Sequence, residues 1–479
     1  MKKIDFIIIT LILVLATVLR LYKISAPVSD LHSWRQADTS AVTRNFVENG
    51  IDIFKPTYDD LSSLQTGYEN PNGLRMVEMP LYNAISAIVV KIIPNISVEV
   101  SGRMVSIFFS LISIIVIYYI ALCEKNRVAA IFSALSFSAM PYIVFFSRVV
   151  LPESTAVSFA MLSVLTVYLS FKKSEKVNYL FFSISIIFFA VAILIKPTTI
   201  FYGIAIALFI AAKFRFETFK VPYGYIFGVF SLLPFILWRW YITQFPEGIP
   251  ANAWLFTMVN TFEGPKEIFF RPAFFRWIFM ERIGSLMLGM FGAFFLALGI
   301  LGKYKSILIP SISLSSLVYL FTFQGGNVQH EYYQTVIFPA VALLTGSGVA
   351  FLHDLSGQKF NKLLSYPVGV IFFIFMLFFS YYNVKNYYSY PQDLNQIAEL
   401  IKLFTDKDDK IVTDRMGDTT LLYLSDRKGA PAIYKEPEEL KNLGYSHIVT
   451  ANKDTGLSLI NRGYKAVVEN DLCTIVALN

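Results

Sequence analysis

The sequence predicts a polytopic α-helical membrane protein that is followed by a small C-terminal α/β domain. Hydrophobic residues make up 55% of the 479 residues and charged residues only 16%, whereas an average soluble domain is about 25% charged. Apolar runs close to the roughly 20 residues that a helix needs to cross a bilayer recur along residues 1–385. Beyond about Pro391, charged residues return and the apolar runs shorten to strand length.

Eleven apolar runs are candidate spans. They are residues 4–22, 103–122, 128–146, 154–171, 178–195, 198–212, 222–242, 283–301, 306–323, 334–352 and 365–383. The first run is expected to be an uncleaved span, because no small-residue cleavage site follows it. Residues 81–93 are apolar but too short to span, so we expect a helix lying in the outer interface. If that segment spanned, the side of every later loop would invert.

The charges of the connecting loops predict the orientation. Short loops that carry Lys or Arg all fall on one side if the spans alternate, and this pattern marks the cytoplasm. The long loops 23–102 and 243–282 and the C-terminal residues then lie outside. The net charge of +7 reflects this arrangement, and no nucleic-acid partner is expected. Cys123 and Cys473 fall on opposite sides, so no disulfide is expected.

Residues 386–479 are expected to form the extracytoplasmic α/β domain, after a membrane module over residues 1–385. Short apolar runs alternate in this region with helix-like stretches. The expected strands are 410–413, 445–450, 464–469 and 473–478, and the expected helices are 393–404 and 437–443. No residue pattern there indicates catalysis, so the expected role is to cap the membrane module or to meet an acceptor.

Polar residues gather at the outer ends of the predicted spans. The densest group is Asp30-Leu31-His32-Ser33-Trp34-Arg35-Gln36-Ala37-Asp38-Thr39, directly after the first span. A flat amphipathic helix is expected over residues 36–49, ending at Gly50, with Arg44 and Glu48 on its solvated face. The other groups are Glu78-Met79-Pro80, Ser147-Arg148 with Pro152-Glu153, Lys196-Pro197 and His330-Glu331-Tyr332-Tyr333.

Taken in order, these motifs resemble the GT-C superfamily of polytopic glycosyltransferases, specifically the family-39-like branch of protein O-mannosyltransferases and lipid A aminoarabinose transferases. The matching residues are Asp30, Glu78-Met79-Pro80-Leu81-Tyr82, Phe146-Ser147-Arg148 with Pro152-Glu153, and His330–Tyr333. The resemblance covers roughly residues 1–385. Leu31 departs from it, since related enzymes often carry a charged residue there. Met79 also departs, because the aminoarabinose enzymes have Lys at this point, so another cation must bind the carrier phosphate.

The resemblance implies an inverting glycosyltransferase in the bacterial cytoplasmic membrane. It would move a sugar from a polyprenyl-phosphate carrier to a hydroxyl of a lipid, glycan or protein acceptor on the outer face. Such a transfer needs a base near the acceptor and cations at the departing phosphate. Asp30 and Glu153 are the expected catalytic residues. The expected substrate-binding residues are His32, Trp34, Arg35, Asp38, Glu78, Arg148, Lys196, His330, Tyr332 and Tyr333.

Arg35, Arg148 and Lys196 are the candidate cations for the carrier phosphate, and arginine suits bidentate phosphate binding. No cofactor is expected, because no close ligand spacing resembles a zinc motif and the branch that the sequence resembles is generally metal-independent. A divalent metal is the alternative, since some GT-C relatives are metal-dependent. Loop 243–282 is rich in aromatic residues and arginine, including Trp254, Phe269 and Arg282. Its expected role is to clamp the lipid carrier, to gate the acceptor, or only to seat on headgroups.

Each of these residues also has a structural alternative. Asp30 would cap an interfacial helix, and Asp38 would cap a helix or pair with Arg35. Glu153 would stabilise a helix start, and Lys196, like Arg148, would reach to headgroups from the end of a span. The aromatic side chains would form an interfacial belt: Trp34, His330, Tyr332 and Tyr333.

Two other functions remain open at the level of sequence. A transporter or lipid flippase would carry charged residues in the middle of its spans and broken helices at matching places in two halves. Here the charges lie at span ends and no repeat is visible. A non-catalytic binder of lipid-linked glycans is the second alternative, and the sequence distinguishes it poorly from an enzyme.

Overall fold

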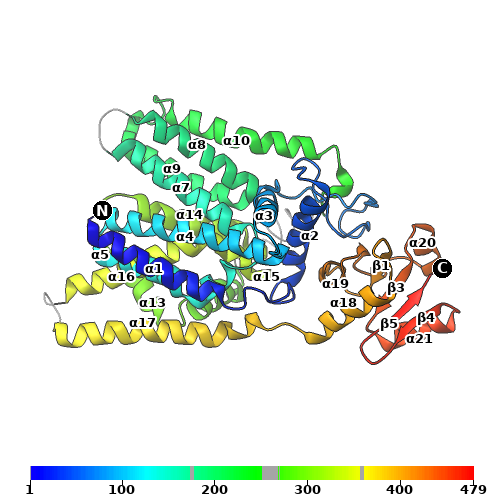
Figure 1. Cartoon of the computed structure of the whole chain (residues 1–479). Helices are drawn as coiled ribbons and strands as arrows, with labels where there is room; N and C mark the ends of the chain where they lie inside the picture. The colour runs from blue at the N-terminus through cyan, green and yellow to red at the C-terminus, as the bar shows by residue number, and fades with distance from the viewer. Residues whose placement is uncertain (1, 173–176, 251–267, 269, 357–360, 479) are drawn as a thin grey trace. The chain divides into compact units, whose positions relative to one another are not determined.

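A computed structural model describes residues 2–172, 177–250, 268, 270–356 and 361–478 (Figure 1). The chain forms two compact units. The helical unit comprises Met1–Ile24, Met104–Trp238 and Ala253–Asn386. The mixed unit comprises Ser25–Arg103, Arg239–Asn252 and Tyr387–Asn479, so it joins the long loop after the first helix to the C-terminal residues.

The helical unit is built of apolar α-helices (Figure 1), together with short 3-10 segments and the 12-residue π-helix η6. They are α1 (Lys3–Leu21), α4 (Val98–Glu124), α5 (Arg127–Ala139), α6 (Pro141–Phe146), α7 (Glu153–Lys172), α8 (Tyr179–Ile195), η1 (Pro197–Phe201), α9 (Tyr202–Phe214), η2 (Arg215–Glu217), α10 (Tyr223–Ile242), α12 (Pro272–Phe275), η6 (Arg276–Met287), α13 (Gly292–Ile300), α14 (Leu308–Thr322), α15 (Gln324–Gln329), η7 (Glu331–Ile337), α16 (Phe338–Leu355) and α17 (Lys362–Val384).

Within the described ranges, seven helices are long and apolar enough to cross a membrane, or up to eight if the pair η6 and α13, bent by 117°, counts as one span. Every one of the eleven predicted spans coincides with helix, but α5, α8 and α14 are shorter apolar helices. The predicted span 128–146 is broken before Pro141, which begins α6. The multi-span helical membrane fold is therefore confirmed, with fewer full-length spans than the sequence predicts.

Close helix packing in this unit depends on small residues of α16, which packs against α5 and α13. A Cβ at Gly346 would overlap Ser133 of α5, and a Cβ at Gly348 would overlap the carbonyl oxygen of Phe295 in α13. Glycine at these two positions lets the helix backbones approach each other, as is common between membrane helices.

The mixed unit combines the segment after α1 with a five-stranded sheet. Its helices are α2 (Ser33–Asn49), α3 (Leu81–Ile92), η3 (Pro246–Gly248), α18 (Gln392–Phe404), α19 (Thr420–Leu424), α20 (Pro437–Asn442) and α21 (Lys453–Asn461), and η8 (Lys385–Tyr388) leads into it. The strands are β1 (Lys410–Thr413), β2 (Lys428–Ala430), β3 (His447–Thr450), β4 (Lys465–Glu469) and β5 (Thr474–Ala477).

The sheet has the order β2-β1-β3-β5-β4, parallel between β2, β1 and β3 and antiparallel between β3, β5 and β4. The four predicted strands are confirmed, as are the helices that match α18 and α20. Strand β2 and helices α19 and α21 were not predicted. The C-terminal region is thus a small mixed α/β sheet whose two faces carry separate apolar cores.

Helix α2 starts at Ser33, three residues before the predicted start, and ends at Gly50, whose φ of 96° suits glycine. The apolar residues of its predicted buried stripe, such as Ala37 and Phe46, are buried. Polar residues such as Gln36 and Asn45 are buried as well. The expectation that Arg44 lies on a solvated face is therefore wrong, since the Arg44 side chain is only 14% exposed. The same expectation for Glu48 is confirmed, because that residue is exposed.

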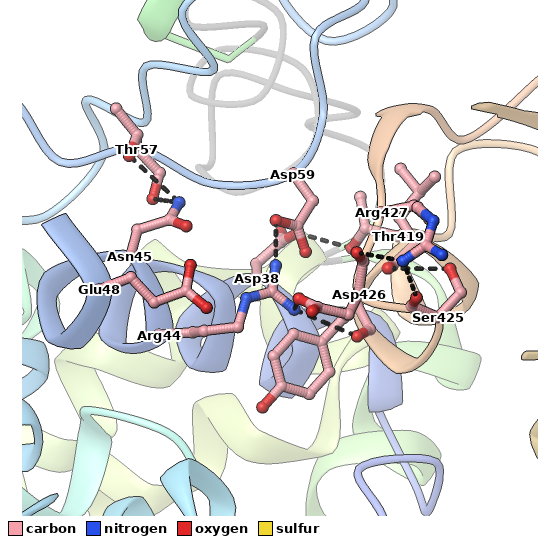
Figure 2. A network of polar contacts seen from close by, with 12 residues as sticks. Asp38, Arg44, Asn45, Glu48, Thr57, Asp59, Thr419, Ser425, Asp426 and Arg427 are labelled. Carbon is pink, nitrogen blue, oxygen red and sulfur yellow. Dashed lines mark hydrogen bonds and ion pairs between the residues drawn. The ribbon is translucent and has the colours of Figure 1, made fainter. Parts of the chain in front are cut away.

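Arg44 connects three segments of the mixed unit (Figure 2). Its Nη2 lies 2.5 Å from Asp59 Oδ1, and its Nη1 lies 2.9 Å from Asp426 Oδ1. The guanidinium carbon lies 5.0 Å from the ring centroid of Tyr423 in α19. Burial raises the pKa of the Asp59 carboxyl, and the positive charge of Arg44 acts in the opposite direction. A buried carboxylate of this kind depends on its cation.

We expect replacement of Arg44 by Met to lower the free energy of unfolding by about 3–5 kcal/mol, because Asp59 would keep a buried charge without a cation. The double variant Arg44→Met/Asp59→Asn should regain most of this loss, since no buried charge remains. Denaturant unfolding of the detergent-solubilised full chain measures both. A single variant as stable as the wild type, or a double variant no more stable than the single, would contradict the role given to this pair.

Candidate active site

Asp30 lies just before α2 and its side chain is held by the first turn of that helix. The residue is 4% exposed, and Gln36 Nε2 donates a hydrogen bond to its Oδ1 at 2.6 Å. The same amide donates to the carbonyl oxygen of Leu31 at 3.0 Å. The N-cap position of α2 belongs to His32, which has a φ of 56°, a conformation that is uncommon outside glycine. Asp30 therefore sits before the cap, in a tight turn fixed by Gln36.

Arg35, in the first turn of α2, pairs with Glu78, which precedes α3. Arg35 Nη2 lies 2.6 Å from Oε1 and 2.7 Å from Oε2 of Glu78. The two side chains are 7% and 14% exposed. Asn83 of α3 supports the arrangement, because its Nδ2 donates to the carbonyl oxygen of Thr39 in α2 at 2.7 Å. The structure thus brings two predicted site residues together across α2 and α3.

Asp38 is the most deeply buried carboxylate of α2, with a side chain only 1% exposed. Arg75 Nη2 lies 2.8 Å from its Oδ2, and Thr419 Oγ1 donates to its Oδ1 at 2.6 Å. Its cation partner is thus Arg75, while Arg35 pairs with Glu78. Sequence reasoning missed both Arg75 and Thr419. No local sequence pattern links either residue to Asp38, and Thr419 is 381 residues away along the chain.

A second carboxylate lies close to this pair. Burial raises the pKa of Asp60 to about 6, with a smaller contribution from the charge of Asp38. Arg75 stacks on the ring of Tyr58, its guanidinium carbon 4.7 Å from the ring centroid. Burial also raises the pKa of Tyr58 well above its usual value. The surroundings of Asp38 are thus acidic and poorly hydrated, with Arg75 as the balancing cation.

Glu153 and Lys196 form an ion pair in the helical unit. Lys196 Nζ lies 2.7 Å from Glu153 Oε1, and the side chains are 7% and 2% exposed. Glu153 begins α7, where the helix dipole favours a carboxylate. Lys196 is the C-cap residue of α8, directly before Pro197 begins η1. Both charges therefore lie at helix ends.

The His330–Tyr333 motif lies beside Lys196. Lys196 Nζ lies 5.8 Å from the ring centroid of Tyr332 and 5.6 Å from that of Tyr333, a cation–π arrangement. The two tyrosine rings stack with centroids 4.9 Å apart, and His330 stacks on Tyr332 at 5.5 Å. Glu153, Lys196 and this aromatic stack are therefore one cluster.

Arg148 and Arg282 are the other cations of interest in this unit. Arg148 is fully buried and its Nη1 donates to the carbonyl oxygen of Tyr22 at 2.6 Å, which favours a structural role over direct phosphate contact. Arg282 lies in η6, and its Nη1 lies 2.7 Å from Glu331 Oε1. Arg282 appears in the predicted aromatic loop, but sequence reasoning did not connect it to Glu331. Trp254 and Phe269 of that loop lie outside the described residues.

The predicted site residues divide between the two units. Asp30, His32, Trp34, Arg35, Asp38 and Glu78 belong to the mixed unit, and Arg148, Glu153, Lys196, His330, Tyr332 and Tyr333 to the helical unit. Trp34 is half-buried, and its carbonyl oxygen accepts a hydrogen bond from Thr419 at 3.3 Å. In the part of the chain that the structure describes, no group of three His, Cys, Asp or Glu side chains is placed to hold a metal ion.

Comparison with solved structures shows the fold. ArnT from Cupriavidus metallidurans in the apo state superimposes with a TM-score of 0.67 at 13% identity, over 98% of this chain and 97% of that chain. The same protein bound to undecaprenyl phosphate gives 0.66 at 12% identity, over 100% and 99%. The apo oligosaccharyltransferase of Archaeoglobus fulgidus gives 0.63 at 10% identity, over 94% and 70%.

Comparison of the sequence with family models and curated proteins matches only part of the chain. A search of curated protein sequences gave no significant match. Residues 77–240 match the family model described as dolichyl-phosphate-mannose-protein mannosyltransferase. This stretch includes the Glu78 motif, Arg148, Glu153 and Lys196. Part of the chain is therefore similar to this family model, and the whole chain has the fold of ArnT.

Proposed function

We propose that this enzyme transfers a sugar from a polyprenyl-phosphate carrier to a hydroxyl acceptor, with inversion at the anomeric carbon, on the outer face of the cytoplasmic membrane. The observation that carries the proposal is the Asp30 carboxylate, held by Gln36 at 2.6 Å in a tight turn before α2. A fixed carboxylate is what a general base for a hydroxyl group requires.

The reaction we propose is a single displacement. The acceptor oxygen bonds to the anomeric carbon of the sugar while the bond from that carbon to the phosphate oxygen breaks. Asp30 takes the proton of the acceptor hydroxyl, and the electron pair of the broken bond leaves with the polyprenyl phosphate. Because the acceptor attacks opposite the phosphate, the configuration inverts.

The leaving phosphate needs positive charge in place before the reaction. We propose that Lys196 supplies it and that Glu153 acts by holding Lys196 charged and oriented, through their 2.7 Å ion pair. Arg35, fixed by both oxygens of Glu78, is the second cation. Arg148 would position the segment after α1 through its bond to Tyr22.

The remaining predicted residues are proposed to bind or position substrate. Trp34 and His32 lie at the start of α2, beside Asp30, where the sugar would be held. Tyr332, Tyr333 and His330 form an aromatic stack on which a sugar or an isoprene unit can pack. Asp38 is fully enclosed by Arg75 and Thr419, so its proposed role is to fix the rotation of α2.

The proposed orientation rests on loop charge and on packing. Short Lys- and Arg-bearing loops mark the cytoplasmic side. Residues Ser25–Arg103 and Tyr387–Asn479 form one compact unit, so both must lie on the same side of the membrane. We propose that this side is extracytoplasmic, with residues 1–385 supplying the membrane module and residues 386–479 the external domain.

Asp30→Asn should lower sugar transfer from a polyprenyl-phosphate-linked donor to acceptors in cell-envelope membranes by about 10²–10⁴-fold, because the base is lost. Asparagine keeps an oxygen that can accept the Gln36 hydrogen bond, so the thermal shift on adding undecaprenyl phosphate should persist. Asp393→Asn, at an exposed position of α18, is the matched control. Transfer by Asp30→Asn near the wild-type rate would show that Asp30 is not the base.

The orientation is tested by cysteine labelling in a background with Cys123→Ala and Cys473→Ala. The variants Tyr68→Cys and Met416→Cys should react with a membrane-impermeant maleimide in intact cells, because these positions of the mixed unit are 60% and 95% exposed. The variant Phe216→Cys, at a position of η2 that is 97% exposed, should react only after the cells are permeabilised, because η2 is proposed to lie on the cytoplasmic side. The reverse labelling pattern would place the mixed unit in the cytoplasm and overturn the proposed side.

A further inference from the structure

The mixed unit contains a polar cavity of about 280 Å³ that the proposed reaction does not use. One wall is the last two turns of α2, with Arg44, Asn45 and Asn49. The opposite wall comes from the segment after α18, including Lys407 and Asp409. The cavity therefore lies between α2 and the C-terminal region, at the end of α2 remote from Asp30.

The lining points to a particular class of ligand. Acidic and basic side chains are equal in number, three asparagines accompany them, and only Leu61 and Pro71 are apolar. A lipid tail would find no apolar wall here, and a strongly anionic ligand would find no net positive charge. Sugar hydroxyls fit, because each both donates and accepts hydrogen bonds. None of the described carboxylates or histidines forms a metal-binding group here.

Asn45 gives independent support for a ligand. The residue is 2% exposed, and its Nδ2 donates to the carbonyl oxygen and to Oγ1 of Thr57, at 2.8 and 3.1 Å (Figure 2). These two acceptors fix the amide orientation. Its Oδ1 has no hydrogen-bond partner among the described residues. A buried acceptor without a donor costs about 1–3 kcal/mol, so a donor that reaches Asn45, a residue of the cavity lining, would remove this cost.

The walls differ in how firmly they are held. Arg44 is fixed by Asp59 and Asp426, at 2.5 and 2.9 Å, so the α2 wall is rigid. Lys407 is held loosely, 3.6 Å from Glu48 and 3.8 Å from Asp426, and its side chain is 68% exposed. Lys407 can therefore turn toward a bound hydroxyl with little loss of ion pairing.

We propose that this cavity binds one sugar unit of the acceptor. The acceptor is then a glycan chain with several sugar units. The proposal rests on the proposed function. Asn45 follows Trp34 by eleven residues in α2, which corresponds to about 16 Å along the helix axis. A single sugar at Asp30 cannot reach the cavity. A chain of several sugars can place its reacting hydroxyl at Asp30 and a distal unit against Asn45.

The cavity can be filled without disturbing its walls. Asn49 and Asn72 are exposed lining residues, and no side-chain hydrogen bond of either is found in the described part of the chain. Asn49→Trp and Asn72→Trp place an indole in the cavity from two sides. Lys441→Trp, at an exposed position of α20 outside the lining, is the matched control.

The probes are fluorescently labelled oligosaccharides of several sugars, released from the envelope glycans of the source cells, and undecaprenyl phosphate. With the full chain in nanodiscs, both cavity-filling variants should bind the oligosaccharides at least tenfold more weakly than the wild type and the control. Undecaprenyl phosphate should bind all four proteins alike. Unchanged oligosaccharide affinity in the filled variants, or a wild type that binds envelope peptides instead, would overturn the inference.

Sugar transfer to the same oligosaccharides separates this inference from the proposed function. If the wild type binds them through the cavity but transfers no sugar to them, the proposed function fails and the binding site stands. If the filled variants transfer sugar with the wild-type KM, the cavity plays no part in acceptor binding and the proposed function stands.

Discussion

A charged side chain removed from water must be paired, and this constraint shapes both clusters of the candidate site. Asp38, 1% exposed, is held by Arg75 and Thr419. Lys196, 7% exposed, is held by Glu153. Breaking such a pair leaves a buried charge and costs about 3–5 kcal/mol. Each pair therefore fixes the elements that carry it, so the start of α2 and the junction between α8 and η1 have defined positions.

The same pairing prepares the site for its chemistry. A cation already desolvated and oriented needs little reorganisation when a phosphate departs, which is the condition for effective electrostatic stabilisation. A donor phosphate must, however, compete with Glu153 for Lys196, or with Glu78 for Arg35. In the proposed function, the carrier would be bound through an exchange of anionic partners, and the acidic residues would keep the cations in place while the site is empty.

The sequence predicts the helices and strands better than it predicts which side chains pair with one another. The lengths of the apolar runs predict the spans and four strands, because run length is a local signal. Strand β2 was missed since Lys428-Gly429-Ala430 is too short to show alternation. The sequence predicts a solvated Arg44, because nothing in α2 indicates that Asp426, far along the chain, lies against it. Pairing of Asp38 with the nearby Arg35 is one of the structural alternatives that the sequence suggests, but the partner in the structure is Arg75.

The most direct test of the central claim is a cryo-EM structure of the full chain with undecaprenyl phosphate bound. The account predicts a phosphate oxygen within about 3 Å of Lys196 Nζ or of the Arg35 guanidinium, at hydrogen-bond distance. It also predicts that Glu153 or Glu78 gives up part of its ion pair to that phosphate. A bound phosphate that contacts neither Lys196 nor Arg35, with both ion pairs intact, would contradict the assignment of the cations.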